Sequence, residues 1–209
     1  MRIPQFLLGT YLHSSRFTEG WQERYQITYS DLEIVGTGER LTEESFNRYR
    51  GQAGVLVAVR PGVQPMETTV RLALREDFCV IGSDGGIEKE RCANNHPRGA
   101  NCFASAIRYA LDERIPLEKI LDKMTTRSAR IIGFPMRGRG ELRNGYIADL
   151  TVFNPETIRG RATNANPCQF SEGIELVIVN GKIAFDRHRP TGEMNGTDIK
   201  YESITQLYY

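Results

Sequence analysis

The pattern of apolar and polar residues predicts a chain that alternates helices with strands over residues 41–132. Residues 54–59 form a continuous run of small and β-branched side chains, which is typical of a strand buried on both faces. A second apolar run, residues 78–81, leads directly into the sequence Gly-Ser-Asp-Gly-Gly. The pattern therefore predicts two buried parallel strands, the second of which presents Asp84 at its carboxyl end.

Apolar residues spaced three or four apart predict the helices between these strands. The first helix is expected to begin after Thr42, a good N-cap with Ser45 at the capping-box position, and to stop near Gly51. The other predicted helices cover residues 66–76, about 101–112 and 116–132. Alternation of this kind predicts an α/β fold with parallel strands, and the segment is long enough for only part of an eight-stranded barrel of about 250 residues.

The two ends of the chain have a different texture. Residues 1–40 are irregular, and the apolar and aromatic positions from Trp21 to Ile34 predict one or two strands or an extended surface segment. After Gly140, glycines and short β-rich runs replace the helical pattern, and Asn180-Gly181 between two apolar runs is a strong hairpin signal. We therefore expect an antiparallel β-sandwich layer in this part of the chain. The predicted division places a partial barrel in residues 1–137 and the β-layer with a polar tail in residues 138–209.

Composition and charge narrow the class of protein. Hydrophobic residues make up 40% of the chain, charged residues 25%, and the net charge is +1, which is typical of a soluble globular protein. No apolar run approaches the roughly 20 residues that a membrane helix needs, and the N-terminus is interpreted as mature sequence. A near-neutral charge does not favour nucleic acid or a membrane surface as a partner, so an arginine-based nucleic-acid binder is the weakest alternative.

The cysteines predict reduced thiols in a cytoplasmic protein, because none of the four forms a C-x-x-C pair. A zinc site built from Cys92, His96 and Cys102 is an alternative, although its spacing matches no common zinc pattern. The sequence also contains no H-x-H, H-E-x-x-H or paired-carboxylate motif. The chain is therefore not expected to assemble a metal site with three protein ligands from histidine and aspartate alone.

Asp84 is the first candidate for chemistry. A carboxylate at the end of a buried strand, flanked by glycines that admit a substrate, could bind a metal-bound water and move its proton. The alternative is a turn or helix-capping aspartate. His96 and Arg98 follow in a polar loop, where the planar guanidinium would suit a substrate carboxylate. The alternative here is a surface loop in which His96 caps the next helix.

The order of motifs carries a family resemblance. Ile81-Gly82-Ser83-Asp84-Gly85 is followed by His96-Pro97-Arg98, then by G-x-L-x-x-G-x-x-A-D-L-x-V-F-x-P over residues 140–155, and finally by V-x-V-N-G over residues 177–181. Over roughly residues 36–185 the chain resembles the C-terminal part of the metal-dependent amidohydrolase superfamily. Within that superfamily the closest resemblance is to the N-acyl-D-amino-acid deacylases, or D-aminoacylases.

The resemblance implies a barrel beside a small β-sandwich, with zinc as the cofactor and an N-acyl amino acid as the small-molecule substrate. Asp84 matches the aspartate that ends the eighth barrel strand, activates the metal-bound water and passes its proton to the leaving nitrogen. His96 and Arg98 match a His-Pro-Arg loop near the substrate pocket, and are expected to bind substrate.

One departure from the family pattern shapes the expectation. The H-x-H pair, the bridging cysteine or acid and the two later metal histidines belong upstream of Gly36, and residues 1–35 do not contain them. The chain is therefore expected to be a C-terminal part of a hydrolase of linear amides: a truncated product, a fragment or a split subunit. The alternative is a non-catalytic module that pairs with itself or with a complementary N-terminal half.

Overall fold

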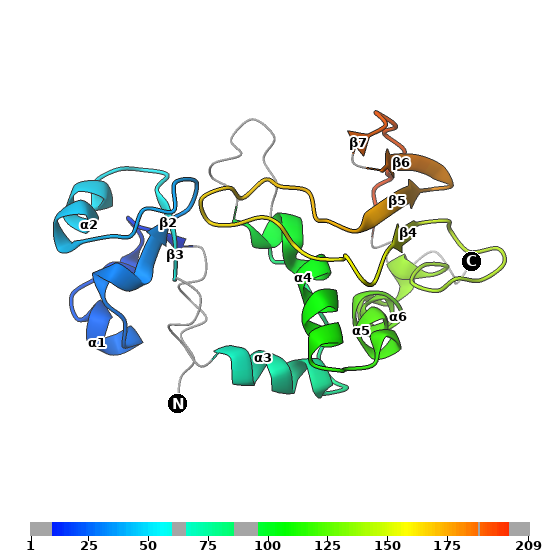
Figure 1. Ribbon diagram of the computed structural model, residues 1–209, viewed down its shortest axis with the longest axis horizontal. Coiled ribbons are helices and arrows are strands. Elements are labelled where there is room, and N and C mark those ends of the chain that lie inside the picture. The colour runs from blue at the N-terminus through cyan, green and yellow to red at the C-terminus, as the bar shows by residue number, and fades with distance from the viewer. Residues whose placement is uncertain (1–9, 60–65, 86–95, 188, 201–209) are drawn as a thin grey trace, which may run out of the picture. The chain divides into compact units, whose positions relative to one another are not determined.

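The fold comes from a computed structural model of the 209-residue chain, which describes residues 10–59, 66–85, 96–187 and 189–200 (Figure 1). The chain divides into two compact units, each made of three segments. The first unit contains residues up to Ala73 together with Ser83–Cys102 and Gly160–Phe170. The second unit contains Leu74–Gly82, Phe103–Arg159 and the residues from Ser171 on. These units group segments by contact, and the division at residue 137 remains a prediction.

Strand β3 (Leu56–Val59) is the centre of a three-stranded sheet in the first unit. All four of its residues are buried, as the apolar run at residues 54–59 predicts. Its neighbours are β1 (Thr10–Tyr11) and β2 (Leu32–Ile34), and both pair with it in antiparallel register. The predicted parallel pairing is wrong for this strand, because both partners come from the N-terminal segment and not from a crossover unit that follows it.

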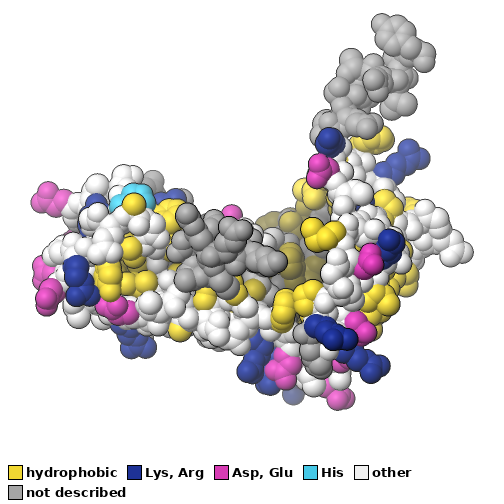
Figure 2. Space-filling view, turned by 90° about the horizontal axis from the view of Figure 1, so that it is seen from above, with side chains coloured by type: hydrophobic (Ala, Val, Ile, Leu, Met, Phe, Trp, Pro, Cys, Tyr) yellow, Lys and Arg dark blue, Asp and Glu magenta, His cyan; other side chains and the backbone are white. Residues whose placement is uncertain are grey.

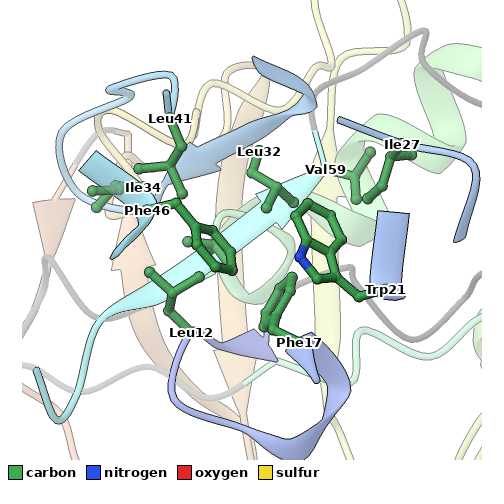
Figure 3. Close-up of a cluster of buried hydrophobic side chains, with 10 residues drawn as sticks. Leu12, Phe17, Trp21, Ile27, Leu32, Ile34, Leu41, Phe46 and Val59 are labelled. Carbon is green, nitrogen blue, oxygen red and sulfur yellow. The ribbon is translucent and has the colours of Figure 1, made fainter. Parts of the chain in front are cut away.

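The segment from Trp21 to Ile34, predicted to form one or two strands or an extended surface segment, contains one strand, β2, and is helical around Trp21. It forms a short helix α1 (Trp21–Tyr25) and a 3-10 turn η3 (Tyr29–Asp31), after a first 3-10 turn η2 (Ser15–Phe17). Trp21 is 5% exposed, stacks on Phe46 with ring centroids 5.3 Å apart and meets Phe17 edge to face (Figure 3). The aromatic residues recur every four positions from Phe17 to Tyr29, so they follow a helical period and build a core instead of lying on the surface.

Helix α2 (Glu43–Arg50) confirms its local sequence signals. The Thr42 Oγ1 atom accepts the Ser45 N–H at 3.2 Å, the Ser45 Oγ atom accepts the Thr42 N–H at 2.8 Å, and Gly51 is the C-cap. This reciprocal pair satisfies two donors that the start of any helix leaves open. The buried face of the helix is Phe46, which joins the aromatic core of the first unit.

Residues 78–81 are not a strand, which corrects the prediction of a buried parallel strand before Asp84. Phe78 is 81% exposed and the segment pairs with no strand. Its backbone groups are satisfied by helix α5 instead: the Ile81 N–H donates to the Lys123 carbonyl at 3.2 Å, and Lys123 Nζ donates to the Cys79 carbonyl at 2.8 Å. An apolar run forms a strand only where another strand offers a ladder, and none lies beside this one in the described ranges.

The three helices predicted over residues 66–132 are observed as four, because the last of them is divided in two. Their bounds are α3 (Met66–Arg75), α4 (Arg98–Asp112), α5 (Leu117–Met124) and α6 (Thr126–Ile132), and a 3-10 turn η5 (Phe134–Met136) follows α6. Residues of α3, α4 and α5 contribute to a second core, in which Ala104, Ile107 and Ala110 form the buried face of α4.

The single helix predicted over residues 116–132 is divided at Thr125. The Thr125 Oγ1 atom donates to the Leu121 carbonyl at 2.7 Å, and the Thr126 Oγ1 atom donates to the Gly140 carbonyl at 2.7 Å. Threonine hydroxyls that bond nearby carbonyls compete with the helical ladder. Thr125 makes such a local bond and lies outside the helical conformation, with φ −125° and ψ −92°, so α5 ends and α6 begins at this residue although the apolar face continues on both sides.

The C-terminal sheet confirms the predicted antiparallel β-layer. Its four strands lie in sequence order and are all antiparallel: β4 (Leu150–Phe153), β5 (Ile174–Val179), β6 (Lys182–Asp186) and β7 (Arg189–Pro190). Asn180 and Gly181 form the β5–β6 turn with φ values of 48° and 78°. The fold is therefore mixed α/β with two antiparallel sheets; within the described residues no barrel closes, and the predicted partial barrel is not confirmed.

The structure also bears on the predictions about membrane helices, surface charge and cysteines. Among the described residues, no helix is both long enough and apolar enough to cross a bilayer. On the face shown in Figure 2, basic and acidic side chains are interspersed. Cys79 and Cys102 carry thiols, but Cys168 is disulfide-bonded, so the prediction of four reduced thiols is wrong. Pairing depends on which Cβ atoms meet in the fold, and spacing along the sequence does not reveal that.

Candidate functional site

Asp84 lies at a sharp bend of the chain in the first unit. Its φ angle is +46°, in the left-handed region that few residues other than glycine adopt. The carboxylate side chain is 90% exposed. The following residue, Gly85, donates its N–H to the Ser83 Oγ atom at 3.4 Å. The bend therefore presents a solvent-accessible carboxylate, although no strand precedes it.

Arg98 reaches back to Asp84 from the first turn of α4. Its Nη2 atom lies 3.0 Å from the Asp84 Oδ2 atom, and its Nε atom donates to the Asp84 backbone carbonyl at 2.8 Å. The Arg98 side chain is 28% exposed, so the guanidinium is largely shielded while its partner is not. Two of the three predicted site residues are thus joined by an ion pair and a hydrogen bond.

His96 is tied to the same helix start. Its Nδ1 atom accepts the Arg98 backbone N–H at 3.1 Å, so the neutral imidazole carries its proton on Nε2. The Nε2 atom is buried and has no hydrogen-bond partner among the described residues. Burial, followed by the positive charge of Arg98, lowers the pKa of His96 to about 4, and the Asp84 carboxylate offsets part of this effect.

The contact with the helix start matches the alternative in which His96 caps the next helix, and it does not exclude a role in binding. The imidazole is a neutral hydrogen-bond donor at neutral pH, because its pKa lies well below 7. Binding roles for His96 and Arg98, and a catalytic role for Asp84, therefore stay predictions. What the structure adds is that all three residues meet at one place.

Two further residues lie at this place: Gly99, which the sequence did not single out, and Cys102, which it offered only as part of an alternative zinc site. Gly99 follows Arg98 and lies against Gly85, where a Cβ atom on Gly85 would come within 2.6 Å of the Gly99 nitrogen. Cys102 lies one helical turn after Arg98, and burial raises the pKa of its thiol against the opposing charge of Arg98. The spacing of four residues between Arg98 and Cys102 was the available signal for the second contact.

The described residues do not fit a resident zinc ion. Within the described ranges, no three His, Cys, Asp or Glu side chains lie close enough together to hold a metal. Asp84 is paired with a guanidinium, which repels a cation. For the alternative of Cys92, His96 and Cys102, Cys92 lies outside the described residues. No step through a metal is therefore derived for this site.

Comparison with protein-family profiles matches residues 15–185 to the amidohydrolase family. The chain is 38% identical over 130 residues to the N-acyl-D-glutamate deacylase of Alcaligenes xylosoxydans xylosoxydans, which covers 59% of this chain and 26% of that protein. It is 34% identical over 166 residues to the D-aminoacylase of the same organism, which covers 77% of this chain and 33% of that protein.

A solved structure is also similar. The crystal structure of N-acyl-D-glutamate deacylase from Bordetella bronchiseptica, complexed with zinc and a phosphonate inhibitor that mimics the tetrahedral intermediate, superimposes with a TM-score of 0.63 at 29% identity. The match covers 83% of this chain and 37% of that protein. The chain therefore spans only about a quarter to somewhat over a third of the length of these relatives.

Proposed function

The chain belongs to the amidohydrolase family, and from that premise we propose that it carries part of a site that hydrolyses the amide bond of N-acyl-D-amino acids. The observation that carries the proposal is the meeting of an exposed carboxylate, a guanidinium and a neutral imidazole at one bend. The names of two similar proteins, a D-aminoacylase and an N-acyl-D-glutamate deacylase, support this choice of substrate.

Asp84 is the proposed general base and acid. Its carboxylate takes a proton from the attacking water and gives it to the leaving nitrogen, so that the acid and the free amino acid are released. The 90% exposure of the side chain gives water and substrate access to it. Transfer of a proton in both directions by one carboxylate keeps the reaction balanced without a further acid.

His96 is the proposed substrate-binding group at this bend, and its neutral imidazole carries a single donor on Nε2. The family resemblance predicts the same role for Arg98, because a guanidinium offers planar, paired N–H donors that match a carboxylate. In this structure the Arg98 guanidinium is already paired with the Asp84 carboxylate.

In this proposal, zinc is bound by residues other than Asp84, His96 and Arg98. The Bordetella bronchiseptica deacylase was solved with zinc, whereas the described residues of this chain provide no cluster of three ligands. We therefore propose that the metal ligands lie outside the described residues, in a complementary polypeptide segment that completes the site. That segment belongs either to a longer protein or to a separate partner chain.

A second candidate, a non-catalytic module, is favoured by the same lack of a ligand cluster in the described ranges. Such a module would pair with another chain or with a second copy of itself. Light scattering of the purified chain tests this pairing: a dimer or a stable complex supports the module, and a folded monomer that binds no partner contradicts it.

The deacylase proposal is tested by the release of free amine from N-acetyl-D-glutamate and N-acetyl-D-leucine, with zinc measured on the dialysed protein. The chain is assayed alone and after mixing with an N-terminal segment of a deacylase relative. Turnover of the D-substrates that falls at least about tenfold in Asp84→Asn supports the proposal. Asp77→Asn is the matched control, because Asp77 is also an exposed aspartate in an ion pair, with Lys119. Absence of turnover in both preparations contradicts the proposal.

A further inference from the structure

Arg98 makes two contacts with Asp84, one to its main chain and one to its side chain. We propose that Arg98 is a positioning residue that holds Asp84 in its bent conformation, and that it is not the group that anchors the substrate carboxylate. This assignment rests on the proposed function for the catalytic role of Asp84, but its structural part does not. It replaces the binding role that the sequence pattern and the family resemblance predict for Arg98.

The two contacts of Arg98 fix different parts of Asp84. The Arg98 Nε atom donates to the Asp84 carbonyl at 2.8 Å, which restrains the main chain, and the Nη2 atom lies 3.0 Å from Oδ2, which restrains the carboxylate. A guanidinium presents these donors in a rigid plane, so the two contacts define one orientation of the residue. Lysine has a single nitrogen and cannot reproduce both.

The bend at Asp84 needs such a restraint. Asp84 has a φ angle of +46°, a region that is unfavourable for residues with a Cβ atom unless the surroundings hold it. The next residue, Gly85, packs its backbone directly on Gly99 of α4. The start of the helix therefore restrains the bend at two successive residues, at Asp84 through the Arg98 side chain and at Gly85 through the Gly99 backbone.

Arg98 is itself held in place by its own neighbours. The Arg98 backbone N–H donates to His96 Nδ1 at 3.1 Å, and Arg98 lies in the first turn of the 15-residue helix α4. The guanidinium thus extends from a rigid helix to the bend at Asp84, so it can hold the bend in place. A substrate carboxylate would have to displace the Asp84 carboxylate from Nη2 before it could bind there.

The kinetic experiment separates positioning from substrate binding. Arg98→Lys and Arg98→Gln are assayed on an N-acetyl-D-amino acid and on its carboxamide, which lacks the carboxylate. Positioning predicts that kcat falls about 10- to 100-fold for both substrates while KM stays within about twofold, because the base is misplaced for either one. A rise in KM that is confined to the carboxylate substrate, with kcat retained, overturns the proposal.

The matched control for these variants lies on the same helix. Arg108 is 30% exposed, pairs with Asp112 at 2.8 Å and resembles Arg98 in both respects. Arg108→Lys and Arg108→Gln are expected to leave kcat and KM unchanged for both substrates. A loss of kcat in these variants equal to that in the Arg98 variants would show a general effect of the helix and would also overturn the proposal.

A spectroscopic experiment tests the contacts without turnover. In the chain labelled with ¹⁵N, the Arg98 Nε–H is expected to exchange slowly with water, both in the wild type and in Asp84→Asn, because its acceptor is the backbone carbonyl. It is expected to exchange rapidly in Gly85→Ala, in which the bend is pushed away from the helix. Rapid exchange in the wild type overturns the positioning role. Slow exchange without deacylation would contradict the proposed function and leave the restraint on Asp84 intact.

Discussion

A Cβ atom on Gly85 would lie 2.5 Å from the Cα atom of Gly99, so the backbones of these two residues are in direct contact. This contact brings the bend at Asp84 against the first turn of α4, where Arg98 reaches the carbonyl and the carboxylate of Asp84. A glycine at position 85 is therefore a condition of the geometry that joins the candidate base to its guanidinium.

Gly85→Ala is expected to separate the bend from the helix and to destabilise the first unit by about 1–3 kcal/mol, the usual cost of forcing a methyl group into a close-packed contact. Urea unfolding followed by circular dichroism measures this change. Gly82→Ala is the control, because a Cβ atom on Gly82 meets nothing within 4 Å. Equal stability of the two variants would contradict a close contact between Gly85 and Gly99.

His96 is expected to make stability depend on pH in the acid range. The pKa of the imidazole is lowered by burial from 6.5 to about 4 in the folded chain. Below pH 6.5 the His96 side chain of the unfolded chain takes up a proton, whereas that of the folded chain stays neutral. The contribution of His96 to the free energy of unfolding is therefore fully present above pH 6.5 and is lost as the pH falls towards 4. Allowing for partial exposure of the ring, the loss is on the order of 1–2 kcal/mol.

The measurement compares the wild type with His96→Asn at pH 7.5 and pH 4.5. Asparagine does not titrate, and its Oδ1 atom can accept the Arg98 N–H in place of Nδ1. The free energy of unfolding of the wild type is expected to fall more steeply between these two pH values. Parallel changes in the two proteins would contradict a buried, neutral His96, and an NMR titration of the ring locates the midpoint directly.

Features that depend on a few neighbouring residues could be predicted from the sequence. The capping box of Thr42 and Ser45 forms as expected, because its partners lie within three residues of each other. The turn at Asn180-Gly181 also forms as expected, because both residue types tolerate the positive φ angles of a two-residue hairpin turn. Features that depend on distant partners could not. Residues 78–81 read as a strand, but their hydrogen bonds go to Lys123, more than forty positions away.

The candidate site shows the same limit. Residue type and the order of motifs pointed to Asp84, His96 and Arg98, because a carboxylate can move a proton and a guanidinium can bind a carboxylate. Their arrangement was not predictable, because Arg98 crosses 14 positions of sequence to reach Asp84, and its contact depends on the packing of Gly85 on α4. The expected position of Asp84 at the end of a strand is accordingly replaced by a bend held from a helix.

The β5–β6 turn offers a prediction about the second unit. Gly181 has a φ angle of +78°, and a Cβ atom there meets nothing within 4 Å, so only the backbone conformation opposes substitution. Gly181→Ala is expected to destabilise the hairpin by about 1–2 kcal/mol. Gly51→Ala is the control, because Gly51 has an ordinary φ of −77° and equally open surroundings. Thermal unfolding of both variants decides whether the turn conformation carries the cost.

Lys123 connects the segment before Asp84 to helix α5, and its removal is expected to be costly. The side chain is fully buried, and its Nζ atom donates to the carbonyls of Glu76 and Cys79. Burial lowers the pKa of this amine. Lys123→Met keeps the apolar stem but leaves two carbonyls without this donor, so we expect a loss of about 2–4 kcal/mol in the free energy of unfolding.

Lys119→Met is the matched control on the same helix. Lys119 pairs with the exposed carboxylate of Asp77 at 2.8 Å, and exposed ion pairs contribute little to stability. Urea unfolding is expected to show a small change for Lys119→Met and a large one for Lys123→Met. Hydrogen exchange of the Ile81 N–H, which donates to the Lys123 carbonyl, should become faster only in the second variant. Unchanged exchange together with unchanged stability in Lys123→Met would show that the buried amine does not hold this segment on the helix.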